Sequence, residues 1–250
     1  MTNDEERAID LNQLGISAFR EGDFAGALSY FHKAEELMSA VVREALRTGR
    51  RMDLGNWLII LDHLGYAYLE LGDLATAYHW SSLATQKAEE ILEKGHREIG
   101  IFYGNFGRVL MAQGAYGPAE EYFQRALDSL RQHLPQDAPE CMDQVHNLAS
   151  VKMARKDYAT AVDMFEAVLA SQERALGSTH PTLIPTLSQL SFAQINRAQW
   201  KRAEEAAERA VEIARSRLGK AHPTTADMEE RLRLLRQAVS SSKNVAKVKL

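Results

Sequence analysis

Apolar residues recur along the chain at steps of three and four, which is the spacing of one face of an α-helix. The pattern comes as pairs of runs separated by a short polar turn, such as GD at 22–23 and 72–73. One helix pair cannot bury its apolar face alone, so several pairs must stack against one another. The hydrophobic pattern therefore predicts an all-α protein built from helix hairpins.

The paired runs are copies of one sequence unit. Five aligned stretches begin at residues 11, 61, 103, 145 and 187, so the spacing is 50 residues once and then 42 residues three times. One aligned column holds only small residues, which let two helices approach closely, since a larger side chain there would overpack the contact. Its members are Gly15, Gly65, Gly107, Ala149 and Ser191. A second column is alanine in every copy: Ala27, Ala77, Ala119, Ala161 and Ala203.

This order of LG, then GD with an aromatic residue or leucine, then alanine resembles the tetratricopeptide repeat. The resemblance covers residues 8 to about 239. The consensus repeat has about 34 residues and ends its second helix with proline. Here that helix lacks the proline and is predicted to run about two turns further, to Gly49, Gly95, Pro135, Gly177 and Gly219. The 42-residue form, with LG-x-x-HP at 176–181 and 218–223 and HNLA at 146–149, is similar to the kinesin light chain subclass.

The resemblance implies a right-handed superhelical solenoid of five repeats, at about 8–49, 54–95, 98–134, 139–177 and 181–219. Residues 223–239 carry one more helical pattern with a charged face, and we expect this helix to cap the last repeat. The segment 240–250 is short, polar and basic, and we expect it to be disordered. No shift in composition divides residues 1–239, so we expect them to form a single domain.

The His-Pro pairs at 180–181 and 222–223 look at first like fragments of an active site. They recur 42 residues apart, between one hairpin and the next. We therefore expect His180 and His222 to lie in structural turns.

The resemblance also implies which surface binds. In the tetratricopeptide family the first helix of each repeat lines the inner, concave face. With the small-residue column as position 8 of that helix, positions 2, 5, 9 and 12 face inward, with positions 6 and 13 beside them. Steps of three and four do return to one helix face. Position 6 holds Gln13, His63, Asn105, Asn147 and Gln189, which are amides in four of the five repeats.

An amide both donates and accepts hydrogen bonds, so a row of amides can hold the main chain of an extended segment. Resemblance to the kinesin light chain family implies this role for Asn105 and Asn147. The alternative is that the amides bond the adjacent helix instead. The other residues expected on the binding surface are Asn12, Phe19, Asp62, Tyr66, Arg108, His146, Ser188, Phe192 and Asn196.

Composition narrows the class of function. The 250 residues carry 30 basic and 34 acidic side chains, for a net charge of −4, so a nucleic-acid partner is not expected. The single cysteine excludes an intramolecular disulfide. The sequence has no Gly-rich phosphate loop, no HExxH and no metal-ligand spacing, so we expect neither an enzyme nor a cofactor. The polar start MTNDEERAID and the short apolar runs indicate a cytoplasmic protein without membrane contact.

The sequence thus predicts a non-catalytic scaffold or adaptor that binds a peptide or protein segment in the inner groove. Two alternatives stay open at this point. The repeats could form a regulatory receptor that changes shape when a peptide binds, because solenoid curvature follows from small rotations per repeat. The outer helices could also pair two chains into a homodimer.

Overall fold

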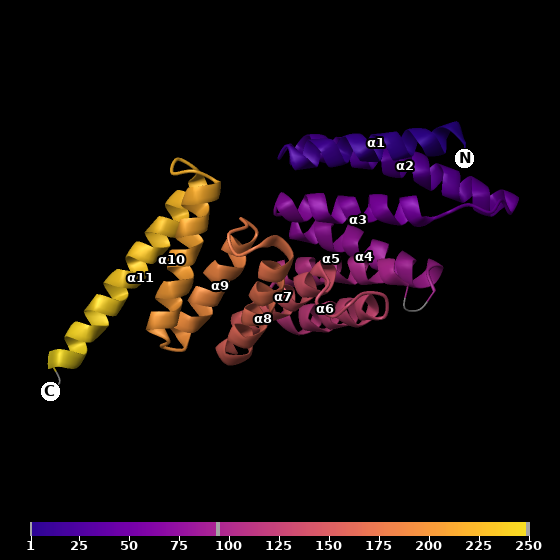
Figure 1. Ribbon diagram of the computed structural model, residues 1–250. Helices are drawn as coiled ribbons and strands as arrows, with labels where there is room; N and C mark the ends of the chain where they lie inside the picture. The colour runs from indigo at the N-terminus through magenta and orange to yellow at the C-terminus, as the bar shows by residue number, and fades with distance from the viewer. Residues whose placement is uncertain (1, 94–95, 249–250) are drawn as a thin grey trace. The chain divides into compact units, whose positions relative to one another are not determined.

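The computed structural model describes residues 2–93 and 96–248, and in these ranges every regular element is an α-helix (Figure 1). The chain forms two compact units, Met1–His133 and Leu134–Leu250. Each unit has its own series of hairpins.

The first unit contains three hairpins. They are α1 (Asn3–Arg20) with α2 (Phe24–Thr48), α3 (Gly55–Glu70) with α4 (Leu74–Ile91), and α5 (Arg97–Ala112) with α6 (Tyr116–Arg131). Successive hairpins pack through α2 on α3 and α4 on α5. The first helices also touch in order, α1 against α3 and α3 against α5, so their inner-face positions adjoin.

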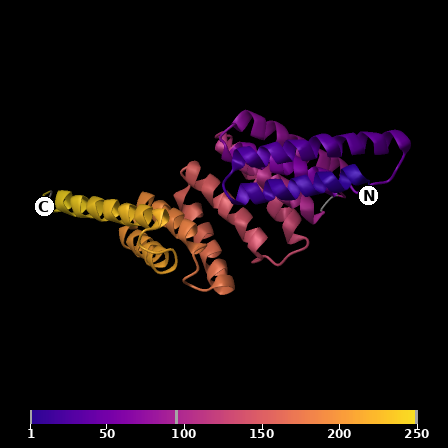
Figure 2. The same ribbon diagram turned by 90° about the horizontal axis from the view of Figure 1, so that it is seen from above.

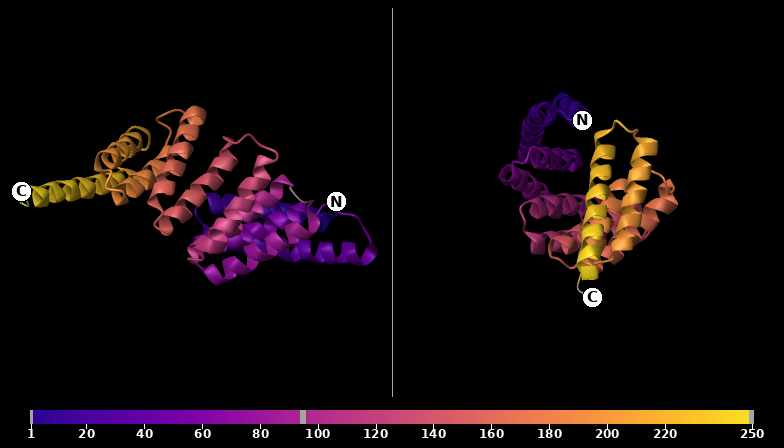
Figure 3. Two further views of the ribbon diagram at one scale, coloured as in Figure 1. Left: turned by 90° about the horizontal axis from the view of Figure 1, so that it is seen from below. Right: turned by 90° about the vertical axis from the view of Figure 1, so that its left-hand side faces the viewer.

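The second unit contains two hairpins and a final single helix. They are α7 (Pro139–Ala154) with α8 (Tyr158–Leu176), α9 (Leu183–Asn196) with α10 (Trp200–Arg217), and α11 (Pro223–Val248). Figure 2 and the right-hand view of Figure 3 show α11 running beside the α9–α10 hairpin, and α11 packs on α10. Five hairpins followed by one helix confirm the fold class predicted from the repeats.

Several helix boundaries differ from those expected. Helices α4 and α6 end at Ile91 and Arg131, each four residues before the Gly95 and Pro135 at which the sequence placed their ends. The first hairpin begins at Asn3 rather than near residue 8, because Thr2 and Glu5 form a capping box with two hydrogen bonds of 3.2 Å. The final helix was expected to end at 239 and to be followed by a disordered tail. The structure instead continues α11 to Val248. The chain has no proline or glycine after Pro223 that would end the helix. Residues 249 and 250 lie outside the described ranges.

In the GD turns the glycine and the aspartate have different roles. Gly22 and Gly72 have φ of 82° and 80°, in the left-handed region that favours glycine. Asp23 and Asp73 then accept hydrogen bonds from backbone N–H groups three residues on, and so cap the second helix. In the last two repeats, the same left-handed position is held by Lys156 and Ala198.

The small-residue column is required by a close contact within the hairpin. A Cβ atom on Gly15 would lie 2.4 Å from the ring of Phe31, and one on Gly107 would lie 2.7 Å from the ring of Phe123. Both distances are shorter than any ordinary carbon contact. The glycines therefore let a phenylalanine of the second helix lie against the first.

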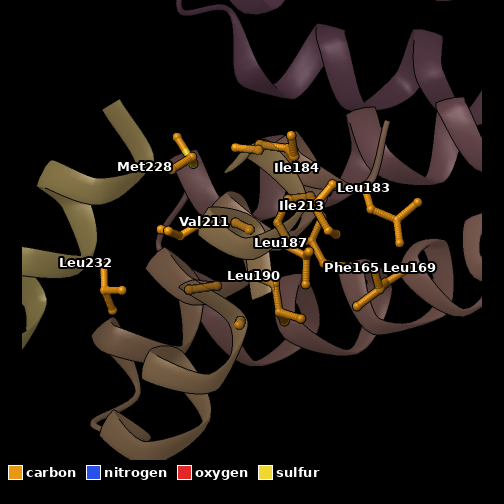
Figure 4. Packing of buried hydrophobic residues seen from close by; sticks show 14 of the residues in the cluster. Phe165, Leu169, Leu183, Ile184, Leu187, Leu190, Val211, Ile213, Met228 and Leu232 are labelled. Atoms are coloured by element: carbon orange, nitrogen blue, oxygen red, sulfur yellow. The ribbon is translucent and has the colours of Figure 1, made fainter. Parts of the chain in front are cut away.

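The core of the second unit is shared between repeats. Figure 4 shows Phe165 of α8 close to Leu183 and Leu187 of α9, with Ile213 of α10 nearby and Met228 of α11 at the edge of the cluster. Each hairpin thus buries its apolar face against its neighbour, as the repeat pattern requires.

Candidate functional site

The inner-face residues of the first unit are joined by hydrogen bonds between consecutive repeats. Nδ1 of His63 on α3 lies 2.8 Å from the amide oxygen of Asn12 on α1. Nδ2 of Asn105 on α5 donates to Oδ2 of Asp62 on α3 at 2.6 Å. In both pairs, position 6 of one repeat bonds position 5 of the repeat before it. We call such a pair a rung.

The rungs decide between the two interpretations of Asn105 in part. Its amide does bond the adjacent helix, which is the alternative that the sequence left open. The side chain is nevertheless half-exposed, whereas Asp62 is buried. Asn105 has a second N–H and an amide oxygen beyond the one donor used in the rung. Gln13, at position 6 of the first repeat, is exposed.

Burial shifts the protonation of both acid–base groups in the rungs. The pKa of Asp62 is raised to about 7, because burial disfavours the carboxylate more than the Asn105 hydrogen bond and the charge of Arg108 favour it. Burial likewise lowers the pKa of His63 to about 4. Near neutral pH this part of the inner face therefore carries a neutral imidazole beside a partly protonated acid.

A cluster of aromatic and charged side chains lies one turn further along the same helices. The rings of Phe19 and Tyr66 are 5.1 Å apart between centroids. The guanidinium of Arg108 lies 4.5 Å from the centroid of Tyr66 and 3.6 Å from a carboxylate oxygen of Glu70. A cation over an aromatic ring stabilises by about 0.5–1 kcal/mol at an exposed site. The structure thus brings together Phe19, Tyr66 and Arg108, three of the residues expected on the binding surface.

Among the described residues of the second unit, no hydrogen bond forms the corresponding rung between α7 and α9, although the two helices touch. In the part of the chain that the structure describes, Nε2 of His146 is buried without a hydrogen-bond partner. Gln189 holds position 6 of the next repeat, but among the described residues it does not bond His146. The His146 ring packs edge-on to Phe165 at 5.2 Å, and burial lowers its pKa. Asn147 is half-buried, with only a long 3.4 Å contact to Gln144 of its own helix.

Between α9 and α11 the rung pattern returns with different residues. Arg231 of α11 donates to the hydroxyl of Ser188 on α9 at 3.4 Å. Arg231 falls 42 residues after Gln189, so α11 continues the repeat register as a further first helix. The charged face of this helix predicted a cap, so Arg231 was not among the residues expected on the binding surface, although its 42-residue spacing is visible in the sequence. Phe192 is half exposed beside this rung, and Asn196 bonds the carbonyl of Phe192 within its own helix.

The His-Pro turns have the structural role that was predicted. Nδ1 of His180 accepts a hydrogen bond from the backbone N–H of Thr182 at 3.3 Å, and Nδ1 of His222 does the same for Thr224 at 3.2 Å. Each histidine thus satisfies a backbone donor near the start of the next helix. His96, before α5, caps in the same way with Glu98.

The described residues form neither a membrane-spanning helix nor a metal site. No described helix is long and apolar enough to cross a membrane. Within residues 2–93 and 96–248, no three His, Cys, Asp or Glu side chains gather as a metal site would require.

Comparison with known proteins identifies the family. The sequence model of the Tetratricopeptide repeat family matches residues 58–132 and 142–228, which is more than half of the chain. The protein therefore belongs to the tetratricopeptide repeat family. A search of curated proteins gives no match.

Solved structures with the same fold include proteins related to kinesin light chains. One is a structure of nearly identical TPR-like repeats from a kinesin light chain of Podosopora anserina. It aligns with a TM-score of 0.65 at 20% identity, over 87% of this chain and 99% of that one. BtubC (BKLC) of P. vanneervenii aligns with a TM-score of 0.67 at 19% identity, over 89% and 95% of the two chains. These likenesses confirm the resemblance to the kinesin light chain-like subclass at the level of the fold.

A third similar structure is a bacterial regulator with a bound peptide. The Rap conjugation gene regulator of the plasmid pLS20, in complex with the Phr* peptide, aligns with a TM-score of 0.70 at 19% identity. The alignment covers 91% of this chain and 58% of the regulator.

Proposed function

We propose that the protein is a non-catalytic interaction module that captures a peptide or protein segment on the inner face of its first helices. The observation that carries this proposal is a pair of exposed isoleucines. Ile59 on α3 and Ile101 on α5 are 38% and 48% exposed, at equivalent positions of two helices that touch. Single exposed apolar residues are ordinary, but a row beside polar groups is typical of a protein-binding surface.

The isoleucines share a helix face with the rungs. Ile59 precedes Asp62 by three residues, and Ile101 precedes Asn105 by four, so each pair lies on one side of its helix. A bound segment could place apolar side chains against the isoleucines and its main chain against the free amide groups of Asn105. The Tyr66–Arg108 pair lies beyond the rung and would contact the next part of the segment.

The fold comparison supports a peptide ligand without assigning one. The Rap regulator of pLS20 shares this fold and is known in complex with the Phr* peptide. The second function that the sequence left open, a peptide-responsive receptor, draws on the same likeness. Small-angle scattering with and without a captured partner separates the two. An unchanged profile favours the scaffold, and a changed profile favours the receptor.

The test of capture uses two matched variants. The double variant Ile59→Ser with Ile101→Ser removes the apolar row, and the control Leu46→Ser removes an exposed leucine from the second helix α2. Proteins captured from a lysate of the native cell are then compared by quantitative mass spectrometry. We expect the double variant to lose partners that both the wild type and the control retain. Equal recovery by all three proteins would contradict the proposal.

A further inference from the structure

Repeats 2 and 5 lack a phenylalanine at one position of the second helix, where they have Ser81 and Ala207 instead. Phe31, Phe123 and Phe165 occupy this position in repeats 1, 3 and 4, and each is at most 1% exposed. The equivalent residue 42 positions after Phe165 is Ala207. The ring that fills the hairpin in three other repeats is therefore missing from the α9–α10 hairpin.

A pocket of about 370 Å³ opens where this ring is missing. Its walls come from α9, α10 and α11, and its lining is mostly apolar: Phe192, Ile195, Trp200, Ala207, Leu234 and Leu235. Phe192 and Leu234 are each 50% exposed. Phe192 is at inner-face position 9 of its repeat, so the pocket opens beside an inner-face position of the second unit. A pocket of this size is at the lower end of the range for ligand sites and suits one or two bulky side chains.

The pocket has one charged residue in its lining, and that residue is a cation. Arg231 lies there together with the hydroxyl of Ser188. The guanidinium has five N–H donors, of which one contacts Ser188 and one contacts Asp227 at 3.0 Å. The pair with Asp227 is exposed and lies within one helix, so it contributes little and can be exchanged for another carboxylate.

We propose that this pocket binds a bulky apolar side chain of the captured segment, with a carboxylate next to that side chain held by Arg231. The inference rests on the proposed function, because Ser188 and Phe192 hold inner-face positions of their repeat. It adds a chemical class of ligand: a segment with an apolar residue adjacent to an acidic residue, or with an apolar residue at its free carboxyl end. The apolar part gains from filling a site that the hairpin leaves empty.

The test uses random short peptides displayed in two formats, one with free carboxyl ends and one with both ends fused. The full-length protein selects binders from each library. We expect binders from the fused library to share a bulky apolar residue next to Asp or Glu. We expect binders from the free-end library to have the apolar residue last. The format that yields the tighter peptides shows whether the carboxylate comes from a side chain or from the chain end.

Selected peptides are then titrated against variants by fluorescence polarisation. Ala207→Phe places a ring at the position that has one in repeats 1, 3 and 4, so it should fill the pocket and weaken binding about tenfold or more. Arg231→Gln should weaken binding by about tenfold. Leu234→Ser removes one wall and serves if Ala207→Phe does not fold. The control is Leu176→Ser, which changes a leucine of similar exposure at the end of α8 and should leave binding unchanged.

The outcomes separate this inference from the proposed function. Peptides that bind the wild type, Ala207→Phe and Leu234→Ser equally would overturn the pocket assignment and leave capture on the inner face intact. Failure of both libraries to yield any binder would count against capture itself, and the pocket assignment would fall with it. Binders without an acidic residue or an apolar end, unaffected by Arg231→Gln, would overturn the carboxylate half of the inference.

Discussion

Asn105 and Asp62 stand 43 positions apart in the chain and are joined by a hydrogen bond of 2.6 Å. The same step, from position 6 of one repeat to position 5 of the repeat before it, joins His63 to Asn12. The polar residues of the inner face therefore tie consecutive first helices together. The rung uses only one of the two N–H groups of Asn105 and leaves its amide oxygen unused. The same amide can therefore both hold the repeats in register and contact a ligand.

The Asp62 rung predicts how stability depends on pH. The folded protein holds the Asp62 proton more tightly than the unfolded chain, because the folded pKa is about 7 against an ordinary value of 3.8. The contribution of this group to the free energy of unfolding is therefore fully present below about pH 4 and is lost as the pH rises through 7. Asp62→Asn keeps an acceptor for Asn105 and has no charge. We expect this variant to exceed the wild type at pH 8 by on the order of a few kcal/mol.

Urea unfolding of the two proteins at about pH 4, 6 and 8 measures this difference. The advantage of Asp62→Asn should shrink toward zero at the lowest pH, where Asp62 is protonated in both states. A difference that stays constant across the three pH values would show that the burial of the charge is not responsible.

The contact between Gly107 and Phe123 predicts a large effect of one methyl group. Gly107→Ala places a Cβ 2.7 Å from the ring, so the hairpin must shift, and we expect a loss of about 1–3 kcal/mol in unfolding free energy. Gly117→Ala is the matched control on α6, where an added Cβ meets nothing within 4 Å. The control should stabilise by about 0.5–1 kcal/mol, because alanine favours the helix. Chemical denaturation that gave both variants the same sign would refute the close packing of the hairpin.

The third hairpin lacks the aspartate cap that its neighbours have. Ala115 precedes α6 with φ −81° and ψ 62°, and Asp73 precedes α4 with φ −79° and ψ 78°, but only the aspartate has a side chain that can cap. Ala115→Asp should therefore gain about 1 kcal/mol in unfolding free energy, and Asp73→Ala should lose about as much. Thermal melts of the two variants check the pair. No gain from Ala115→Asp would mean that the α5–α6 turn cannot present the carboxylate to the helix.

The repeat register was predictable because it depends on local chemistry. The repeat is marked by a glycine that accepts positive φ, an aspartate that caps the next helix and a small residue that faces a ring. These residue types recur at fixed spacing in the sequence, as Gly22, Asp23 and Gly15 show. The length of α11 was less predictable. The serines and lysines after residue 239 are compatible with a solvated tail and with a helix. No proline or glycine there marks where the helix ends.

The chemistry of the inner face was predictable only in outline. The row at position 6 was visible in the sequence. The partner of each side chain, however, depends on the residue at position 5 of the repeat before it, which the idea of a uniform amide row leaves out. The pocket in the last repeat had a visible signal, because Ala207 stands where repeats 1, 3 and 4 have phenylalanine. That replacement leaves space only if no neighbouring side chain fills it, and the sequence does not determine this. The buried Nε2 of His146 had no signal in the sequence, because its burial depends on tertiary packing.

The central claim is that partners bind the inner face of the first helices. Site-specific photo-crosslinking tests it most directly, with one photoreactive residue placed in turn at inner positions 59, 101 and 192 and at Leu46 and Leu176 on second helices. The account predicts crosslinks to the captured partner from the three inner positions and none from the two controls. Crosslinks confined to Leu46 or Leu176, with none from the inner face, would contradict it.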